Sequence, residues 1–342
     1  MFVDRSKFLF RFVFFVLSLS GFTFFLFFGS DILPAKLSID AIKVSQYLDN
    51  PLFLDGSFRT TGAFLYSFGE FFAFFITWIT GLLFIGIVAT VSKNLIGICL
   101  ALYLIVPCLA LNLVWPAKET IVIIMSILVY SLYNTLLVRK NMRLSFVLGV
   151  VILYFLYSYF FRMYYFLIIA FYLGICFIHL KLKLNLLLSL MIMVLVFAFL
   201  PNEFHAISQG QRDISNAYAQ LIGSDNRTAF TNLVSAEGGL NYIYNFFWAM
   251  LHLLLPVLFF HSINEFVLLS YNILFVYAIY RSFSYCPYHN KNNIFMSLLF
   301  ISHYYVQVLF EPDLGSYLRH ILSVVIYLLP AFFLIAARKE IQ

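Results

Sequence analysis

Long apolar runs alternate with short polar connections along this chain. The runs are about 20 residues long, which is the length that a helix needs to cross a hydrocarbon core of roughly 30 Å. We predict about ten membrane spans: residues 8–29, 70–92, 95–114, 120–138, 144–161, 163–178, 184–200, 266–280, 294–310 and 321–337. Strict alternation of apolar and polar residues is absent from these runs. The pattern therefore predicts an all-α polytopic membrane protein.

Two connections are too long and too polar to be simple turns. The first covers about residues 30–69 and includes an amphipathic stretch, residues 38–48, that predicts a helix lying along the membrane surface. The second covers about residues 201–265. Within it, residues 240–260 are long enough to cross but include Asn245 and His252, so we expect a re-entrant or interfacial helical segment there. The whole chain is expected to form a single integral membrane domain.

The positions of the basic residues indicate the orientation of the chain. If residues 240–260 do not cross, most of the 21 lysines and arginines lie on the side of the two termini, which the positive-inside rule makes cytoplasmic. If they do cross, the basic residues divide almost evenly and the bias disappears. We therefore predict ten crossings with both termini cytoplasmic. Every acidic residue except Asp4 and Glu340 then lies outside, which indicates that the outer face carries the chemistry.

Composition narrows the class of protein further. Of the 342 residues, 63% are hydrophobic and 11% are charged, whereas soluble domains carry roughly 25% charged residues. The basic residues behind the net charge of +6 lie in short connections, so no nucleic-acid partner is implied. The four cysteines lack paired spacing, which disfavours disulfides or a metal site. Phosphate-loop, dinucleotide-binding and nucleophile-elbow motifs are missing from the sequence, which disfavours ATP-driven transport and serine hydrolysis.

The densest group of ionisable residues lies between the last two apolar runs, in the decapeptide Glu311-Pro-Asp-Leu-Gly-Ser-Tyr-Leu-Arg-His320. Ionisable groups at a membrane boundary are costly and usually functional. Pro312 and Gly315 are expected to keep this segment from continuing either neighbouring helix. His320 is a candidate general base, with Glu311 or Asp313 as its partner or as the base itself. The alternatives are a helix-end histidine that binds backbone and two acids that only stop a helix.

Basic residues at other boundaries of the predicted outer face extend this candidate site. A guanidinium binds phosphate through two parallel hydrogen bonds and stays charged, so a set of arginines suits a lipid pyrophosphate at the interface. The candidate pyrophosphate-binding residues are Arg319, Arg162, Arg212, Arg227 and Lys118, with Arg59 less favoured. Each of them can instead snorkel or pair with a nearby carboxylate, which for Lys118 would be Glu119.

Three further ionisable residues, two aspartates and a histidine, are weaker candidates for the site. Asp40 and Asp55 invite comparison with the loop carboxylate of sugar transferases that use polyprenyl-phosphate donors, although neither has a second acid beside it. His252 lies in an apolar segment, and we interpret it as a packed residue rather than a ligand.

The pattern resembles the bacterial oligosaccharide repeat-unit polymerases, the Wzy-type enzymes of O-antigen and capsule assembly. The resemblance rests on Asp40, Tyr47 and Gly62-Ala-Phe-Leu-Tyr66, on Pro116-Ala-Lys-Glu119, on Arg162-Met-Tyr-Tyr165, on Arg212 and Arg227 in the late connection, and on Gly315-Ser-Tyr-Leu-Arg-His320. It implies transfer of a growing glycan from undecaprenyl pyrophosphate onto the acceptor sugar of a new lipid-linked repeat unit, at the periplasmic face of the inner membrane. It also implies a chain-length regulator protein as a partner, and no cofactor, because the pyrophosphate link is already activated.

Two other functions stay open from the sequence. One is a glycosyltransferase that uses a polyprenyl-phosphate sugar, with Asp40 or Asp55 as its base. The other is a flippase or transporter for lipid-linked oligosaccharides, in which the arginines line a path through the membrane. A transporter would be favoured by charged residues midway through the spans, and spans two to seven carry almost none away from their ends.

Overall fold

The computed structural model describes residues 5–34, 38–50, 56–221, 227–284 and 292–336, and these residues form helices joined by turns and short loops. Seven helices among them are long and apolar enough to cross a membrane, or up to nine if each of two bent helix pairs is one span. The expected all-α polytopic membrane protein is therefore confirmed. The chain divides into two compact units. Unit 1 comprises Met1–Phe166, Ser284–Met296 and Leu322–Gln342, and unit 2 comprises Leu167–Phe283 and Ser297–Ile321.

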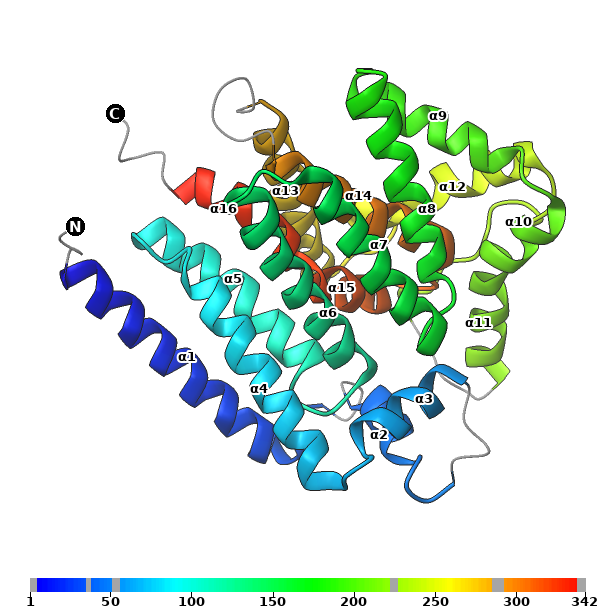
Figure 1. The fold of residues 1–342 in the computed structure, drawn as a ribbon. Coiled ribbons are helices and arrows are strands. Elements are labelled where there is room, and N and C mark those ends of the chain that lie inside the picture. Colours follow the sequence, from blue (N-terminus) through cyan, green and yellow to red (C-terminus); the bar gives the residue numbers. More distant parts are fainter. Residues whose placement is uncertain (1–4, 35–37, 51–55, 222–226, 285–291, 337–342) are drawn as a thin grey trace. The chain divides into compact units, whose positions relative to one another are not determined.

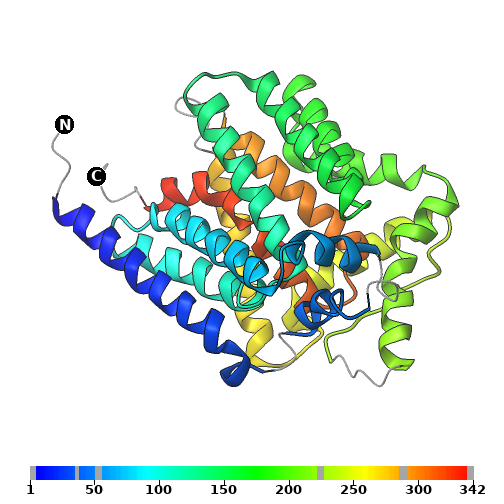
Figure 2. The same cartoon turned by 60° about the horizontal axis from the view of Figure 1, so that its bottom comes forward.

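Unit 1 is built on the amino-terminal helices. These are α1 (Arg5–Ile32), α2 (Ile39–Ser45), α3 (Gly56–Leu65), α4 (Glu70–Ala89), α5 (Leu95–Asn112), α6 (Lys118–Leu132) with a π-helical continuation Tyr133–Val138, and α7 (Arg143–Phe160). Helix α4 packs against α1, α5 and α6, and both ribbon views show α1 running beside α4 and α5 (Figures 1 and 2). The last helix, α16 (Leu329–Ala336), packs on α5, and a 3-10 turn, Val325–Leu328, packs on α6.

An asparagine fixes the junction between α5 and α16. Asn94 Oδ1 accepts a hydrogen bond from Gly97 N at 2.9 Å, which satisfies a donor at the start of α5. Its Nδ2 donates to Ala336 O at 2.8 Å, at the end of α16. One side chain thus caps two helix ends that are far apart in the sequence.

Unit 2 contains the greater part of each remaining helix, and some of these helices have their first or last residues in unit 1. They are α8 (Tyr165–Cys176) with a π-helical continuation Phe177–Lys181, α9 (Leu186–Ala198), α10 (Asn202–Ser208), α11 (Gly210–Leu221), α12 (Gly239–Leu254), α13 (Ile263–Ser284), α14 (Asn293–Phe310) and α15 (Leu314–Ser323). Tyr305 of α14 stacks on Phe171 with 3.7 Å between ring centroids and lies 4.7 Å from the Phe246 ring. These aromatic contacts place α14 in the core of the unit.

The apolar run 184–200 does not continue as one straight helix. Helix α9 ends at Ala198, and the helical segment Asn202–Leu221 is bent by 112° from it. Figure 1 shows the chain changing direction between α9 and α10. Pro201 stands at this break, where a proline cannot donate the backbone hydrogen bond that would extend the helix. The late polar connection therefore begins with helices. The helix predicted within residues 38–48 is present as α2, whereas its place along a membrane surface stays a prediction.

The decapeptide differs from its predicted form. Pro312 does follow the end of α14, but Gly315, Arg319 and His320 lie inside α15, so the expectation that the segment continues neither helix is half wrong. The reason is the side chain of Asp313, whose Oδ1 accepts a hydrogen bond from Ser316 N at 2.9 Å and caps the new helix. The last apolar run is also broken, with a bend of 59° between Leu314–Ser323 and Val325–Ala336.

Candidate functional site

The decapeptide after α14 is tied to the late polar connection by backbone pairing within unit 2. Phe230 N donates to Pro312 O at 3.1 Å, and Ala229 forms an antiparallel bridge with Asp313. Asn216 of α11 adds a third contact, because its Nδ2 donates to Phe230 O at 2.8 Å. The two polar segments that the sequence analysis singled out in this half of the chain therefore lie together.

Arg212 of α11 holds the carboxyl end of α14. Its buried side chain donates from Nε to Glu311 O at 2.9 Å, from Nη2 to Val308 O and to Leu309 O at 3.2 Å, and from Nη1 to Asn232 Oδ1 at 2.6 Å. The last carbonyls of a helix need such donors. Four of the five N–H groups of this guanidinium are thus used within the protein, which leaves at most one for the pyrophosphate that was predicted as its ligand.

Asn232 and Asp213 hold that guanidinium in place. Asn232 donates from its backbone N to Asp213 Oδ1 and from Nδ2 to Asp213 Oδ2, both at 2.9 Å. The Phe230 ring covers the guanidinium carbon of Arg212 at 4.8 Å. The roles of Asn232 and Asp213 as partners of Arg212 were not predicted, because a polar residue in a long connection carries no spacing signal that would reveal its contact.

Glu311 and His320 form a hydrogen-bonded pair, in which His320 Nδ1 donates to Glu311 Oε1. The Glu311 side chain is 5% exposed and that of His320 is 18% exposed, so the carboxylate is sealed and the ring is the more accessible member. Burial raises the pKa of the Glu311 carboxyl, but His320, a hydrogen bond from Ser316 and the charge of Arg319 lower it further, so the pKa ends below its ordinary value. The ionised carboxylate fixes the tautomer with its proton on Nδ1, which puts the lone pair on Nε2. Such a pair can accept a proton from a hydroxyl.

Arg319 and Asp313 lie beside this pair. Arg319 is partly exposed, and its charge lowers the pKa of both neighbouring carboxyls, Glu311 and Asp313. Burial raises the pKa of Asp313 above its ordinary value, and the charge of Glu311 adds to that shift. Because Asp313 Oδ1 is engaged with Ser316 N, the contact that the structure gives this carboxylate is a helix cap.

A line of polar side chains extends from the pair into α14. His303 and Gln307 precede Glu311 by eight and four residues, so the three fall on one face of the helix. His303 is 2% exposed and lies near His320. Gln307 is 6% exposed, and its Oε1 has no hydrogen-bond partner among the residues that the structure describes. Polar groups thus continue from the Glu311–His320 pair into the enclosed helix α14.

Arg227 forms a separate ion pair in unit 2. Its Nη2 donates to Glu265 Oε1 at 2.6 Å and to Ser262 Oγ at 3.1 Å. The Arg227 side chain is 53% exposed, whereas that of Glu265 is 2% exposed. One face of this guanidinium is therefore neutralised, and the other is accessible.

His252 is packed between aromatic rings, as the sequence analysis expected. Its ring lies 4.7 Å from Phe230 and 3.6 Å from Phe259, nearly parallel to both. Its Nδ1 is hydrogen-bonded with Trp248 O at 2.9 Å. These contacts identify it as a structural residue of the α12 region.

Three of the candidate cations lie in unit 1. Arg59 is exposed on α3, and each of the other two pairs with an acid. Arg162, after α7, donates from Nη2 to Glu119 Oε1 at 3.2 Å, and both side chains are buried. Lys118 Nζ lies 4.0 Å from Asp40 Oδ2 and 3.5 Å from the centre of the Phe58 ring. The pairing expected between Lys118 and Glu119 is therefore replaced by two pairs with residues from other segments. Neighbours on a helix point in directions about 100° apart, so they do not face each other.

Asp55, metal ligands and comparisons with known proteins add nothing to the description of the site. Asp55 lies outside the described residues. No group of three or more histidine, cysteine or acidic side chains placed to hold a metal occurs in the part of the chain that the structure describes. Comparisons with protein-family models, with curated proteins and with solved structures give no match.

Proposed function

We propose that this multi-pass membrane protein polymerises undecaprenyl-pyrophosphate-linked oligosaccharide repeat units, transferring the glycan on one lipid carrier to the acceptor sugar of another. The observation that carries the proposal is the Glu311–His320 pair at the end of the enclosed helix α14, with Arg319 in the same cluster. The lipid carrier and the repeat-unit substrate come from the resemblance to Wzy-type polymerases. The pair supplies a base that such a transfer needs.

The proposed reaction is a glycosyl transfer onto a hydroxyl group. His320 Nε2 accepts the proton of the acceptor hydroxyl while that oxygen attacks the anomeric carbon of the donor sugar. The bond from the anomeric carbon to the phosphate oxygen breaks, and the pyrophosphate leaves with the electron pair. Arg319, which is partly exposed, stabilises the charge that develops on the leaving group, and Glu311 stabilises the imidazolium.

Arg212 supports this reaction indirectly. By donating to the last carbonyls of α14 and to the backbone of Glu311, it fixes the carboxylate that orients His320. We therefore assign Arg212 as a positioning residue and keep Arg319 and the accessible side of Arg227 as candidate phosphate ligands.

Both proposed substrates carry lipid tails, so the transfer belongs at a membrane boundary. The decapeptide starts directly after α14 and includes the first residues of the bent pair that begins at Leu314. The junction of two such apolar segments is where a chain that crosses a membrane meets water. We propose the periplasmic side of the inner membrane for this site, with both termini in the cytoplasm, on the basis of the basic-residue bias in the sequence.

A knockout examined for its surface glycan tests the proposal. Loss of a polymerase leaves single repeat units on the final acceptor, and complementation with the wild-type gene should restore long chains. His320→Asn retains a donor toward Glu311 but lacks Nε2, so it should leave single units although the protein reaches the membrane at the wild-type level. Restoration of long chains by both His320→Asn and Glu311→Gln would contradict the proposed role of the pair.

A second candidate function is a transporter driven by proton movement. The observation that favours it is the polar line formed by His303 and Gln307 of α14 with Glu311 directly after the helix, because buried histidines and acids in membrane helices mark proton paths. The same knockout separates the two functions. Loss of a flippase leaves no repeat unit on the acceptor, whereas loss of a polymerase leaves one.

A further inference from the structure

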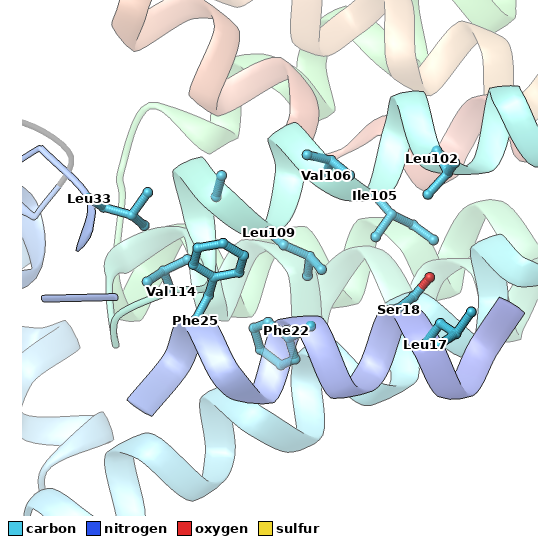
Figure 3. A pocket seen from close by; sticks show the side chains of 12 residues that line it. Leu17, Ser18, Phe22, Phe25, Leu33, Leu102, Ile105, Val106, Leu109 and Val114 are labelled. Carbon is cyan, nitrogen blue, oxygen red and sulfur yellow. The ribbon is translucent and has the colours of Figure 1, made fainter. Parts of the chain in front are cut away.

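A cavity of about 410 Å³ lies between α1 and α5 within unit 1 (Figure 3). Figure 3 shows Phe22 and Phe25 of α1 on the side that faces Leu109 of α5. Among the described residues that line the cavity, only Ser18 has a polar side chain. The volume is in the range of about 300–1,000 Å³ that is typical of small-molecule sites.

Water does not suit this cavity. A buried water needs two to four polar partners, and an apolar cavity without them stays dry. Ser18 is one potential partner, and the remaining described lining is hydrocarbon. The cavity is partly open, so an apolar molecule from the surroundings can enter it.

The surroundings of α1 and α5 are the hydrocarbon core of a membrane. Both helices are long and apolar enough to cross it, over Phe8–Gly29 and Leu95–Asn112. An apolar space that opens from such a pair of helices meets lipid tails at very high concentration. Filling it with a tail restores the contacts that its walls otherwise lose.

The length of the cavity lining suits one acyl chain. Its lining extends over nine residues of α1, from Leu17 to Phe25, and over nine residues of α5, from Leu102 to Ala110, which is eight helical steps on each helix. At 1.5 Å per residue this is about 12 Å, and lining residues beyond the helix ends lengthen it. The result is close to half of the roughly 30 Å hydrocarbon core, which is the depth of one leaflet. A long polyprenyl chain exceeds that depth.

We propose that this cavity is a binding site for an acyl chain of a bilayer phospholipid, which fills the space between α1 and α5. This inference is independent of the proposed polymerase activity. It makes the lipid part of the packing of α1 against the rest of unit 1.

Gly21 provides a way to fill the cavity from the protein side. It lines the cavity, and a Cβ atom added to it would meet nothing within 4 Å. The side chain of Gly21→Leu therefore starts in open space, and we expect the rest of it to occupy the space of the acyl chain. Ala110→Leu fills the same space from α5, and it is a second variant in case the first fails to fold. Val13→Phe is the matched control, because Val13 is on α1, 46% exposed and outside the lining.

The experiment measures bound phospholipid on the purified full-length chain in detergent. Native mass spectrometry and lipid extraction should find phospholipid on the wild type and on Val13→Phe, and roughly tenfold weaker retention on Gly21→Leu, because the added side chain displaces several CH₂ groups. Added dioleoyl phosphatidylglycerol should raise the Tm of the wild type and of the control, and it should raise that of the filled variant much less.

Two results would overturn the inference. One is equal phospholipid retention and equal Tm response in the wild type and in both filled variants. The other is a polyprenyl lipid, rather than phospholipid, as the species that the wild type carries and the filled variants lose.

Discussion

Replacing Arg212 by methionine should loosen the end of α14 and with it the candidate site. Methionine keeps most of the length and apolar volume of the side chain but has no donor. The carbonyls of Val308, Leu309 and Glu311 would all lose the donor that Arg212 provides. All three residues are buried, so water is poorly placed to replace it.

The expected loss of stability follows from these three acceptors. Leaving a buried acceptor unsatisfied costs about 1–3 kcal/mol, so three of them give about 3 kcal/mol at the low end. Removing one partner of a buried, charged network costs about 3–5 kcal/mol by mutational experience, which agrees with that sum. This is a large part of the 5–15 kcal/mol or so that keeps a typical domain folded. Arg212→Lys retains a charge and three N–H donors on one nitrogen, so its loss should be intermediate.

The assay is thermal unfolding of the purified chain in detergent, followed by tryptophan fluorescence. Gln211→Met is the matched control, because Gln211 is the exposed neighbour on the same helix. The Tm should fall strongly for Arg212→Met, less for Arg212→Lys and little for the control. If Arg212→Met unfolds at the same temperature as Gln211→Met, then Arg212 does not hold the end of α14 and its assignment as a positioning residue is wrong.

Three further predictions concern ionisable groups. Asp313→Ala should cost about 1 kcal/mol through loss of the α15 cap, whereas Asp313→Asn should retain most of it, and equal melting losses would contradict the cap. Folding lowers the pKa of Glu311 from its ordinary value of 4.5, so the stability that its ionised carboxylate contributes is fully present above about pH 4.5 and is lost as the pH falls through the pKa of the folded protein. The Tm of Glu311→Gln should therefore fall less in acid than the Tm of the wild type. Parallel curves of Tm against pH would refute this. Arg162→Met should destabilise the protein by about 3–5 kcal/mol, because it leaves Glu119 buried without its cation. Adding Glu119→Leu should recover part of that loss in the same assay. A double variant that is no more stable than the single one would argue against the pair.

The helices were predictable because their apolar runs have the length that a membrane demands. The breaks were less predictable, since they depend on single side chains. The cap provided by Asp313 moves the start of the last helical segment upstream to Leu314, and Pro201 turns the chain after α9. Both residues are visible in the sequence, but only a contact with a specific backbone group decides whether a helix starts or stops there.

The candidate site was predictable in its chemistry and much less so in its contacts. The cluster of Glu311, Arg319 and His320 was found because charges between apolar runs are rare. The role of Arg212 as a donor to the last carbonyls of α14 was not predicted, because these acceptors lie almost a hundred residues further along the chain. Burial of a guanidinium against backbone carbonyls is a tertiary event, and no local pattern in the sequence encodes it.

The Glu311–His320 pair is tested most directly by the rate of glycan transfer itself. Membranes that contain the wild-type chain or His320→Asn are supplied with undecaprenyl-pyrophosphate-linked repeat units, and the length of the lipid-linked products is followed with time, alongside the Tm of each protein. We expect the wild type to form multi-repeat products and His320→Asn to be slower by about 10²–10⁴-fold with little change in Tm, as loss of a general base requires. Wild-type rates with His320→Asn, or the absence of any multi-repeat product with the wild type, would contradict the account.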